Sequence, residues 1–178
     1  MSMIFGMVAL TPEQMIKLRG SSKLASDLIF ANQNDGTELQ LDGLGRIEAP
    51  LDLQKSWHIL HYVFTGSIGP VGSPGDTLLS GGDDLGEDVG YGPPRLLDTQ
   101  NTQRFAEFLQ ALDLNTLQSR VDFKTMSAAQ VYSLPMGVGA EADFEIGIRR
   151  EISSYFPVLR HYVSSAARNG NGLLMWLV

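Results

Sequence analysis

The chain has 178 residues, enough for one domain whose core needs neither disulfides nor a structural metal. It contains no cysteine, which excludes disulfides, thiol catalysis, iron–sulfur clusters and cysteine-bound zinc. Its net charge of −7 and its lack of clustered Lys and Arg argue against a nucleic-acid partner.

The N-terminus does not read as a targeting signal. Residues 1–14 lack a basic segment, and their apolar run is short and ends where a helix is expected to begin. The sequence also lacks a run of about 18 apolar residues, so we expect no membrane span. These features are typical of a cytoplasmic bacterial protein with no membrane partner.

Residues 3–9 form a short apolar run that predicts a buried strand. The next helix begins with a capping box, in which Thr11 is the N-cap, Pro12 occupies the first helical position and Gln14 the third. It is expected to end at Gly20. Two more elements are expected before residue 50, a helix at 22–32 and a brief strand at 38–41.

The stretch LDLQKSWHILHYVFTG, residues 51–66, predicts a helix over 53–65 that begins at Pro50 or Asp52 and ends before Gly66. At 100° per residue, one apolar stripe groups four side chains, those of Leu53, Trp57, Leu60 and Phe64.

His58 and His61 lie on one flank of this stripe, so we expect both at the polar edge of the helix. The expected cost in stability is about 3–5 kcal/mol for Trp57→Ala. For either histidine replaced by Ala it is about 1 kcal/mol or less.

Residues 66–92 hold nine of the chain's 19 glycines. We expect a long loop there, broken by a turn of helix near 76–81, with residues 67–88 as the most mobile part of the chain. Residues 91–98, YGPPRLLD, are expected to be extended, because Pro disfavours helix in the residue before it.

Several helices and one strand are predicted after this point. The helices are one capped by Asp98 or Thr99, one at 115–120, one from Asp122 to about Gln130, and one at 143–168 with a break or kink at Pro157, and residues 133–142 are expected to be a loop. The terminal apolar run 173–178 predicts a buried strand. Together the elements predict a single α+β domain over 1–178, whose small central sheet includes both chain termini and is packed with several helices.

The pair His58 and His61 is the first candidate site. Side chains three positions apart on a helix are neighbours, so the two rings can share a proton or a ligand. Three roles are open: boundary residues of the core, the polar edge of a ligand cleft, and metal ligands. No third ligand stands nearby and the pattern His-Glu-x-x-His is absent, so we expect no metal.

Trp57 and the turn GYGPPR provide the other candidates. Trp57 is expected in the core, with its indole N–H donating to a backbone carbonyl. Tyr91 and Arg95 stand on a turn stiffened by two prolines and can bind an anion or carboxylate. The alternative is that Arg95 pairs with an acid of residues 83–88. The acids there lack the spacing of a calcium loop.

Four stretches together resemble the YfbM-like family of small bacterial proteins of unknown function: FGMVALTPEQ, LDLQKSWHILHYVFTG, LGEDVGYGPPRLL and SSAARNGNGLLMWLV. The resemblance covers nearly the whole chain and implies a single cytoplasmic α+β domain. It implies no activity, cofactor or catalytic residue. It places seven residues of interest in the signature stretches, Asp52, Trp57, His58, His61, Tyr91, Gly92 and Arg95.

The leading hypothesis is a cytoplasmic domain that binds a small molecule or a protein, without catalysis and without a cofactor. The alternative is an enzyme acting on a small polar or anionic substrate. It would use His58 or His61 as general base, with Tyr91 and Arg95 as binding groups. A third hypothesis is an immunity-like protein that binds a basic partner through the acidic loop.

Overall fold

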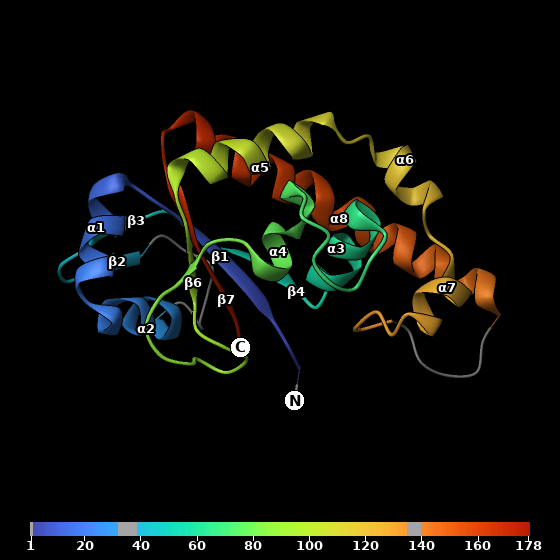
Figure 1. Ribbon diagram of the computed structural model, residues 1–178, viewed down its shortest axis with the longest axis horizontal. Helices are drawn as coiled ribbons and strands as arrows, with labels where there is room; N and C mark the ends of the chain where they lie inside the picture. Colours follow the sequence, from blue (N-terminus) through green and yellow to red (C-terminus); the bar gives the residue numbers. More distant parts are fainter. Residues whose placement is uncertain (1, 32–38, 135–139) are drawn as a thin grey trace.

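The computed structural model describes residues 2–31, 39–134 and 140–178 (Figure 1). Its centre is a five-stranded antiparallel sheet with the strand order β4-β1-β7-β6-β5. The strands of this sheet are β1 (Phe5–Leu10), β4 (Leu51–Gln54), β5 (Asp83–Asp84), β6 (Arg95–Leu97) and β7 (Gly172–Leu177). A separate hairpin joins β2 (Leu39–Leu41) to β3 (Gly45–Ile47).

The two ends of the chain pair with each other in the middle of the sheet. Strand β1 runs antiparallel to β7 along its whole length, from Phe5 opposite Leu177 to Leu10 opposite Gly172. Trp176 in β7 is only 5% exposed. The predicted α+β fold, with both termini in one sheet, is confirmed.

The central strands of the sheet carry apolar side chains on both faces, so each face has to be covered by other elements to keep these side chains from water. In β1, the side chains of Phe5 and Met7 belong to one core cluster and those of Val8 and Leu10 to another. Figure 1 shows the sheet between two groups of elements. The smaller group consists of the hairpin, α1 (Pro12–Gly20) and α2 (Ser22–Ala31).

The larger group contains most of the helices and, with them, the candidate sites (Figure 1). Its members are α3 (Trp57–Thr65), the 3-10 helix η1 (Pro74–Asp76), α4 (Thr77–Ser80), α5 (Thr99–Ala111), α6 (Leu114–Ser119), α7 (Phe123–Ala128) and α8 (Glu141–Arg168). Asp98, Asp113 and Asp122 each cap a helix here by accepting a backbone N–H three residues on. The helix starts expected at Asp98 and Asp122 are therefore confirmed.

The capping box at the start of α1 is also confirmed. The Gln14 N–H donates to Thr11 Oγ1 (3.2 Å), and the Thr11 N–H donates to Gln14 Oε1 (2.9 Å). The Gln14 amide group also donates to the carbonyls of Leu44 and Arg46. One side chain thus fixes the helix start and ties it to the β2–β3 hairpin.

The helix predicted over 53–65 begins later than expected. Residues 51–54 form the edge strand β4 beside β1, and α3 starts only at Trp57. Asp52 is not an N-cap: its Oδ1 accepts the N–H of Gln54, a residue with φ of 51° that ends the strand. Leu53 fits the apolar stripe predicted for the helix because its side chain, although it comes from a strand, packs in the same core cluster as the other three residues of the stripe.

Two further expectations differ in detail. Helix α8 runs without interruption through Pro157, so of the predicted break or kink the break is wrong, and the kink stays a prediction. The loop expected at 66–92 contains η1, α4 and β5, of which only the turn near 76–81 was predicted. Asn32, Glu38 and residues 135–139 of the expected loop lie outside the described residues.

Candidate functional site

Four rings stack in a row from the sheet to the outer side of α3. Phe5 lies 6.4 Å from Trp57, Trp57 lies 4.9 Å from His58, and His58 lies 6.1 Å from His61, measured between ring centroids. The planes of each pair are within 26° of parallel. The sequence therefore placed Trp57, His58 and His61 correctly as neighbours.

His58 is held in one tautomer by its neighbours. The backbone N–H of Tyr132 donates to His58 Nδ1 at 2.9 Å, so Nδ1 carries the lone pair and Nε2 the proton. Nε2 faces the carbonyl oxygen of Ile68 at 3.4 Å. Burial lowers the pKa of His58 below its ordinary value, the Ile68 carbonyl opposes this effect, and the charge of His61 adds to it.

His61 is fully buried, and both of its ring nitrogens face backbone carbonyls. Nδ1 lies 3.3 Å from the oxygen of Gly75, and Nε2 lies 3.3 Å from the oxygen of Gly69. A neutral imidazole has a single N–H and can donate to only one of them. The ring thus contacts two points of residues 66–92, which we call the Gly-rich segment.

The expectation that His58 and His61 line a polar edge is wrong. Every residue of α3 from Trp57 to Phe64 is buried, so the helix has no solvent-facing side along this length. The periodicity of α3 could not reveal this, because the outer side of the helix is covered by η1 and α4 of the Gly-rich segment.

Trp57 lies in the core as expected, at 5% exposure. Its indole Nε1 is buried and has no hydrogen-bond partner among the described residues, so the expected bond to a backbone carbonyl is not found there. A buried N–H group without a hydrogen-bond partner is uncommon and lowers the stability of the folded state, so this nitrogen destabilises the packing around α3.

Asp76 is a buried carboxylate whose role was not predicted from the sequence. Its Oδ2 accepts the N–H groups of Val71 (2.9 Å), Gly72 (2.7 Å) and Ser73 (3.0 Å), and so fixes the bend of the Gly-rich segment before η1. Its Oδ1 is buried without a partner among the described residues. The signal was present, since Ser73 and Asp76 have the spacing of a capping box.

Arg95 is neither free nor paired with an acid. Its guanidinium donates to the carbonyls of Leu78 (3.0 Å), Gly81 (3.0 Å) and Thr77 (3.4 Å), and so caps the C-terminus of α4. Burial lowers the pKa of Arg95, while the nearby charge of Asp84 acts to raise it. Tyr91 is 40% exposed, and its backbone N–H donates to the carbonyl of Leu177.

The sequence-predicted residues therefore act on different parts of the Gly-rich segment. His58 and His61 contact the carbonyls of residues 68–75, and Arg95 contacts those of residues 77–81. In this arrangement the proposed general base and the proposed anion anchor are engaged with backbone.

Capping of helix ends by arginine is repeated elsewhere in the fold. Three more side chains donate to carbonyls at or just beyond helix C-termini: Arg120 to Val63 in α3 (2.6 Å), Arg149 to Gln118 in α6 (3.3 Å) and Arg160 to Leu112 after α5 (3.4 Å). Together with Arg95, four of the 13 Lys and Arg side chains of this acidic chain therefore cap helix C-termini.

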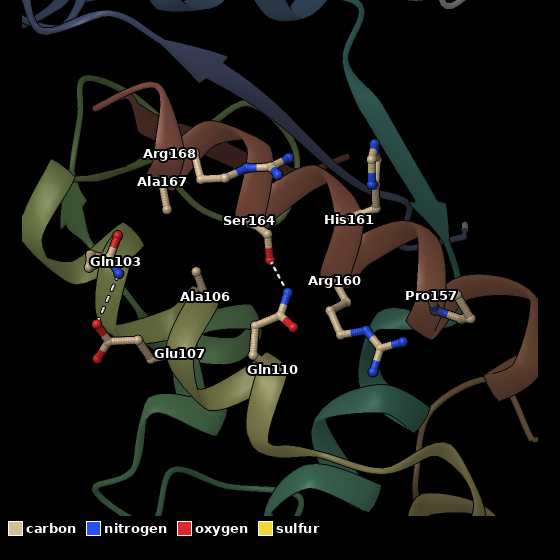
Figure 2. Close-up of a pocket in the computed structure, with 10 residues that line it drawn as sticks. All are labelled: Gln103, Ala106, Glu107, Gln110, Pro157, Arg160, His161, Ser164, Ala167 and Arg168. Atoms are coloured by element: carbon tan, nitrogen blue, oxygen red, sulfur yellow. Dashed lines mark hydrogen bonds between the residues drawn. The ribbon is translucent and has the colours of Figure 1, made fainter.

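A groove with a volume of about 710 Å³ lies between α5 and α8 (Figure 2). Seven of its ten lining residues have polar side chains. The ten are Gln103, Ala106, Glu107, Gln110, Pro157, Arg160, His161, Ser164, Ala167 and Arg168. Gln110 Nε2 donates to Ser164 Oγ at 2.7 Å and links the two walls, while Gln103 donates to Glu107 along α5.

This groove was not predicted from the sequence. In the sequence, each wall is an exposed polar stripe of a helix that reads as an ordinary solvated face. The two stripes face each other because α5 and α8 pack side by side on the sheet. The residues that meet across the groove, such as Gln110 and Ser164, are 54 positions apart.

Two further findings concern the described residues as a whole. The described residues contain no group of three or more His, Asp or Glu side chains that could hold a metal ion. None of the helices in the described part of the chain is both long enough and apolar enough to cross a membrane.

The family described as "Domain of unknown function (DUF1877)" matches residues 1–176. The chain belongs to this family. No curated protein is significantly similar to it. The fold is similar to the crystal structure of YfbM from Escherichia coli, described as a protein of unknown function, with a TM-score of 0.67. The two are 22% identical, and the match covers 98% of this chain and 99% of YfbM.

At this level of identity the match to YfbM shows a shared fold and carries no activity. The YfbM-like family suggested by the signature stretches is confirmed, as is its description as a family of unknown function. A function for this chain has to be argued from its own side chains.

Proposed function

We propose that this DUF1877 chain is a non-catalytic binding domain of the bacterial cytoplasm, and that the α5–α8 groove binds a small polar ligand. The size and lining of the groove carry this proposal. Its volume of about 710 Å³ is within the range of roughly 300–1,000 Å³ typical of ligand sites. Its walls offer both hydrogen-bond donors and acceptors to a ligand.

The histidine enzyme is the less favoured candidate. A general base has to reach the proton that it removes, but His61 is fully buried and His58 is only 9% exposed. Catalysis by either histidine would first require the Gly-rich segment to move away from α3. The acidic-loop hypothesis also lacks a specific observation: Asp83 already pairs with Arg19, and Asp88 accepts two backbone N–H groups.

A variant that fills the groove tests the proposal. Ser164 is half-buried on the α8 wall, so Ser164→Trp should obstruct the groove, whereas Ser154 is exposed on the same helix and does not line it. Purified parent protein, Ser164→Trp and the Ser154→Trp control would be compared by thermal shift against a panel of sugars, amino acids, nucleotides and organic acids.

We expect at least one compound to raise the melting temperature of the parent and of Ser154→Trp, because binding to the folded state stabilises it. The same compound should have no effect on Ser164→Trp. Equal shifts in all three proteins would mean that the compound binds elsewhere, and a panel without any stabilising compound would also contradict the proposal.

A further inference from the structure

Arg168 stands out among the cations of the groove. It is exposed, and it has no hydrogen-bond or ion-pair partner among the residues that the structure describes. Figure 2 shows its side chain running along α8 in the direction of Ser164. Its guanidinium therefore has five N–H donors free for a ligand at one end of the groove.

Arg160 provides a second cation, and this one is held in place. Its guanidinium lies over the Phe156 ring, 5.0 Å from the centroid, and donates one hydrogen bond to the Leu112 carbonyl at 3.4 Å. These contacts fix its orientation but use few of its donors, so it can bind an acid group at little further cost in entropy. His161, seven positions before Arg168 on the same outer side of α8, also lines the groove, and Figure 2 shows its ring pointing away from α5.

The distance between the two arginines defines the shape of the ligand. Eight helical positions separate Arg160 from Arg168, so their backbone positions lie roughly 12 Å apart along the axis. Figure 2 shows the Arg160 guanidinium turned away from Arg168, so we do not expect one compact anion to contact both groups. Between them the groove offers the linked pair Gln110 and Ser164, with the small side chain of Ala167 beside it.

Glu107 is the only carboxylate among the lining residues, and it stands on the α5 wall. Gln103 donates to it at 2.9 Å, so it is already paired, and its charge disfavours an anion on that wall. The net charge of −7 repels anions from the protein as a whole, so an anionic ligand has to rely on the local cations of α8.

We infer that the groove binds an elongated ligand with an acid group, carboxylate or phosphate, at each end. Arg160 binds one acid group and Arg168 the other, while Gln110 and Ser164 bind polar groups in the middle. This inference rests on the proposed function and adds the chemical class of the ligand to it.

The test uses isothermal titration with three probes. Sebacate is an elongated dicarboxylate, fructose 1,6-bisphosphate carries phosphates at both ends, and malonate is too short to reach both arginines. The variants are Arg168→Gln and Arg160→Gln, and the control is Arg104→Gln, an exposed arginine on α5 that does not line the groove. Circular dichroism would verify that each variant is folded.

We expect sebacate or the bisphosphate to bind more tightly than malonate, and the better of the two identifies the acid group. Each groove variant should weaken that binding by about tenfold or more, because it removes a charge-assisted hydrogen bond, while the control keeps the parent affinity. Arg160 also caps α5, so Arg160→Gln can fail to fold. In that case the affinity of Arg168→Gln alone tests the inference.

Unchanged affinity in Arg168→Gln, or equal affinity for malonate and the longer probes, would overturn the inference. If a neutral compound binds the parent but not Ser164→Trp, and none of the three anions binds, the ligand class is wrong and the binding groove stands. If the anions bind Ser164→Trp as well as they bind the parent, the groove is not their site and both proposals fail.

Discussion

The backbone N–H of Tyr132 donates a hydrogen bond of 2.9 Å to Nδ1 of His58, across 74 positions of the chain. The bond needs the lone pair of Nδ1, so it exists only while the His58 ring is neutral. Protonation of His58 would also place two N–H groups in a buried environment beside His61. The packing of the chain around α3 thus depends on the protonation state of His58.

The first prediction concerns pH. The pKa of His58 in the folded protein lies below its ordinary value of 6.5, so below about pH 6.5 the unfolded chain binds the proton more readily. The free energy of unfolding should therefore fall as the pH drops from 6.5 toward the folded pKa, and this contribution should level off below it. Urea unfolding between pH 5 and pH 8 measures the effect.

The controls for this prediction are two histidine variants. His58→Gln cannot titrate, so its stability should depend less on pH than that of the parent. His161→Gln removes an exposed histidine and should behave like the parent. If the parent and His58→Gln show the same pH dependence, the role given to the Tyr132 hydrogen bond is wrong.

The second prediction compares two members of the ring stack, Trp57 and His61. Trp57→Ala should reduce the free energy of unfolding by about 3–5 kcal/mol, the usual cost of deleting a large buried aromatic side chain. For His61→Ala the sequence-based expectation of about 1 kcal/mol is too small. This variant removes a fully buried ring and the one N–H that the ring can donate to the carbonyl of Gly75 or Gly69, so we now expect about 2–3 kcal/mol.

Urea denaturation of both variants tests this ordering. Ile68 is 42% exposed on the same segment, and Ile68→Ala is a suitable control that should cost much less. A His61→Ala variant as stable as the control would mean that the two carbonyls find other partners and that His61 does not hold the Gly-rich segment.

The third prediction concerns Asp76 and the mobility of the Gly-rich segment. Asp76→Ala removes the acceptor of three backbone N–H groups and should cost about 2–3 kcal/mol. In the parent, amide exchange should be slower at residues 71–73 than at residues 86–88, whose N–H groups have no hydrogen-bond partner among the described residues, and the variant should lose this difference. Equally fast exchange of both stretches in the parent would contradict the role of Asp76.

The contacts of Asp76 limit the range of residues that we expect to be mobile in the Gly-rich segment. Composition predicts residues 67–88 as the most mobile part of the chain, because glycine raises the entropic cost of ordering. That mobility is still a prediction. The contacts of Asp76 and His61 lead us to expect it mainly at residues 86–88, whose N–H groups have no hydrogen-bond partner among the described residues.

The parts of the fold that were predictable depend on local signals. A capping box at Thr11, N-cap aspartates at Asp98 and Asp122 and a terminal apolar run each determine structure within a few residues. The start of α3 was mistaken because Leu53 satisfies the apolar pattern of a strand and of a helix equally well. Pairing with β1, a distant segment, decides between them.

The sites were less predictable because they depend on tertiary contacts. The residues Trp57, His58 and His61 do lie together, but their burial is set by the Gly-rich segment, whose path is fixed by Asp76. The α5–α8 groove has no sequence signature, since polar residues on an exposed helix face are common. It exists only because two such faces meet on one side of the sheet.

The most direct test of the central claim is an NMR titration of the isotopically labelled protein with sebacate or fructose 1,6-bisphosphate. The account predicts that the largest amide shifts occur in the groove, at Gln103, Gln110, Ser164 and Arg168, with residues 58–76 unchanged. Shifts concentrated at His58, His61 and Gly69 instead would contradict it. They would place the site beneath the Gly-rich segment and favour the histidine enzyme.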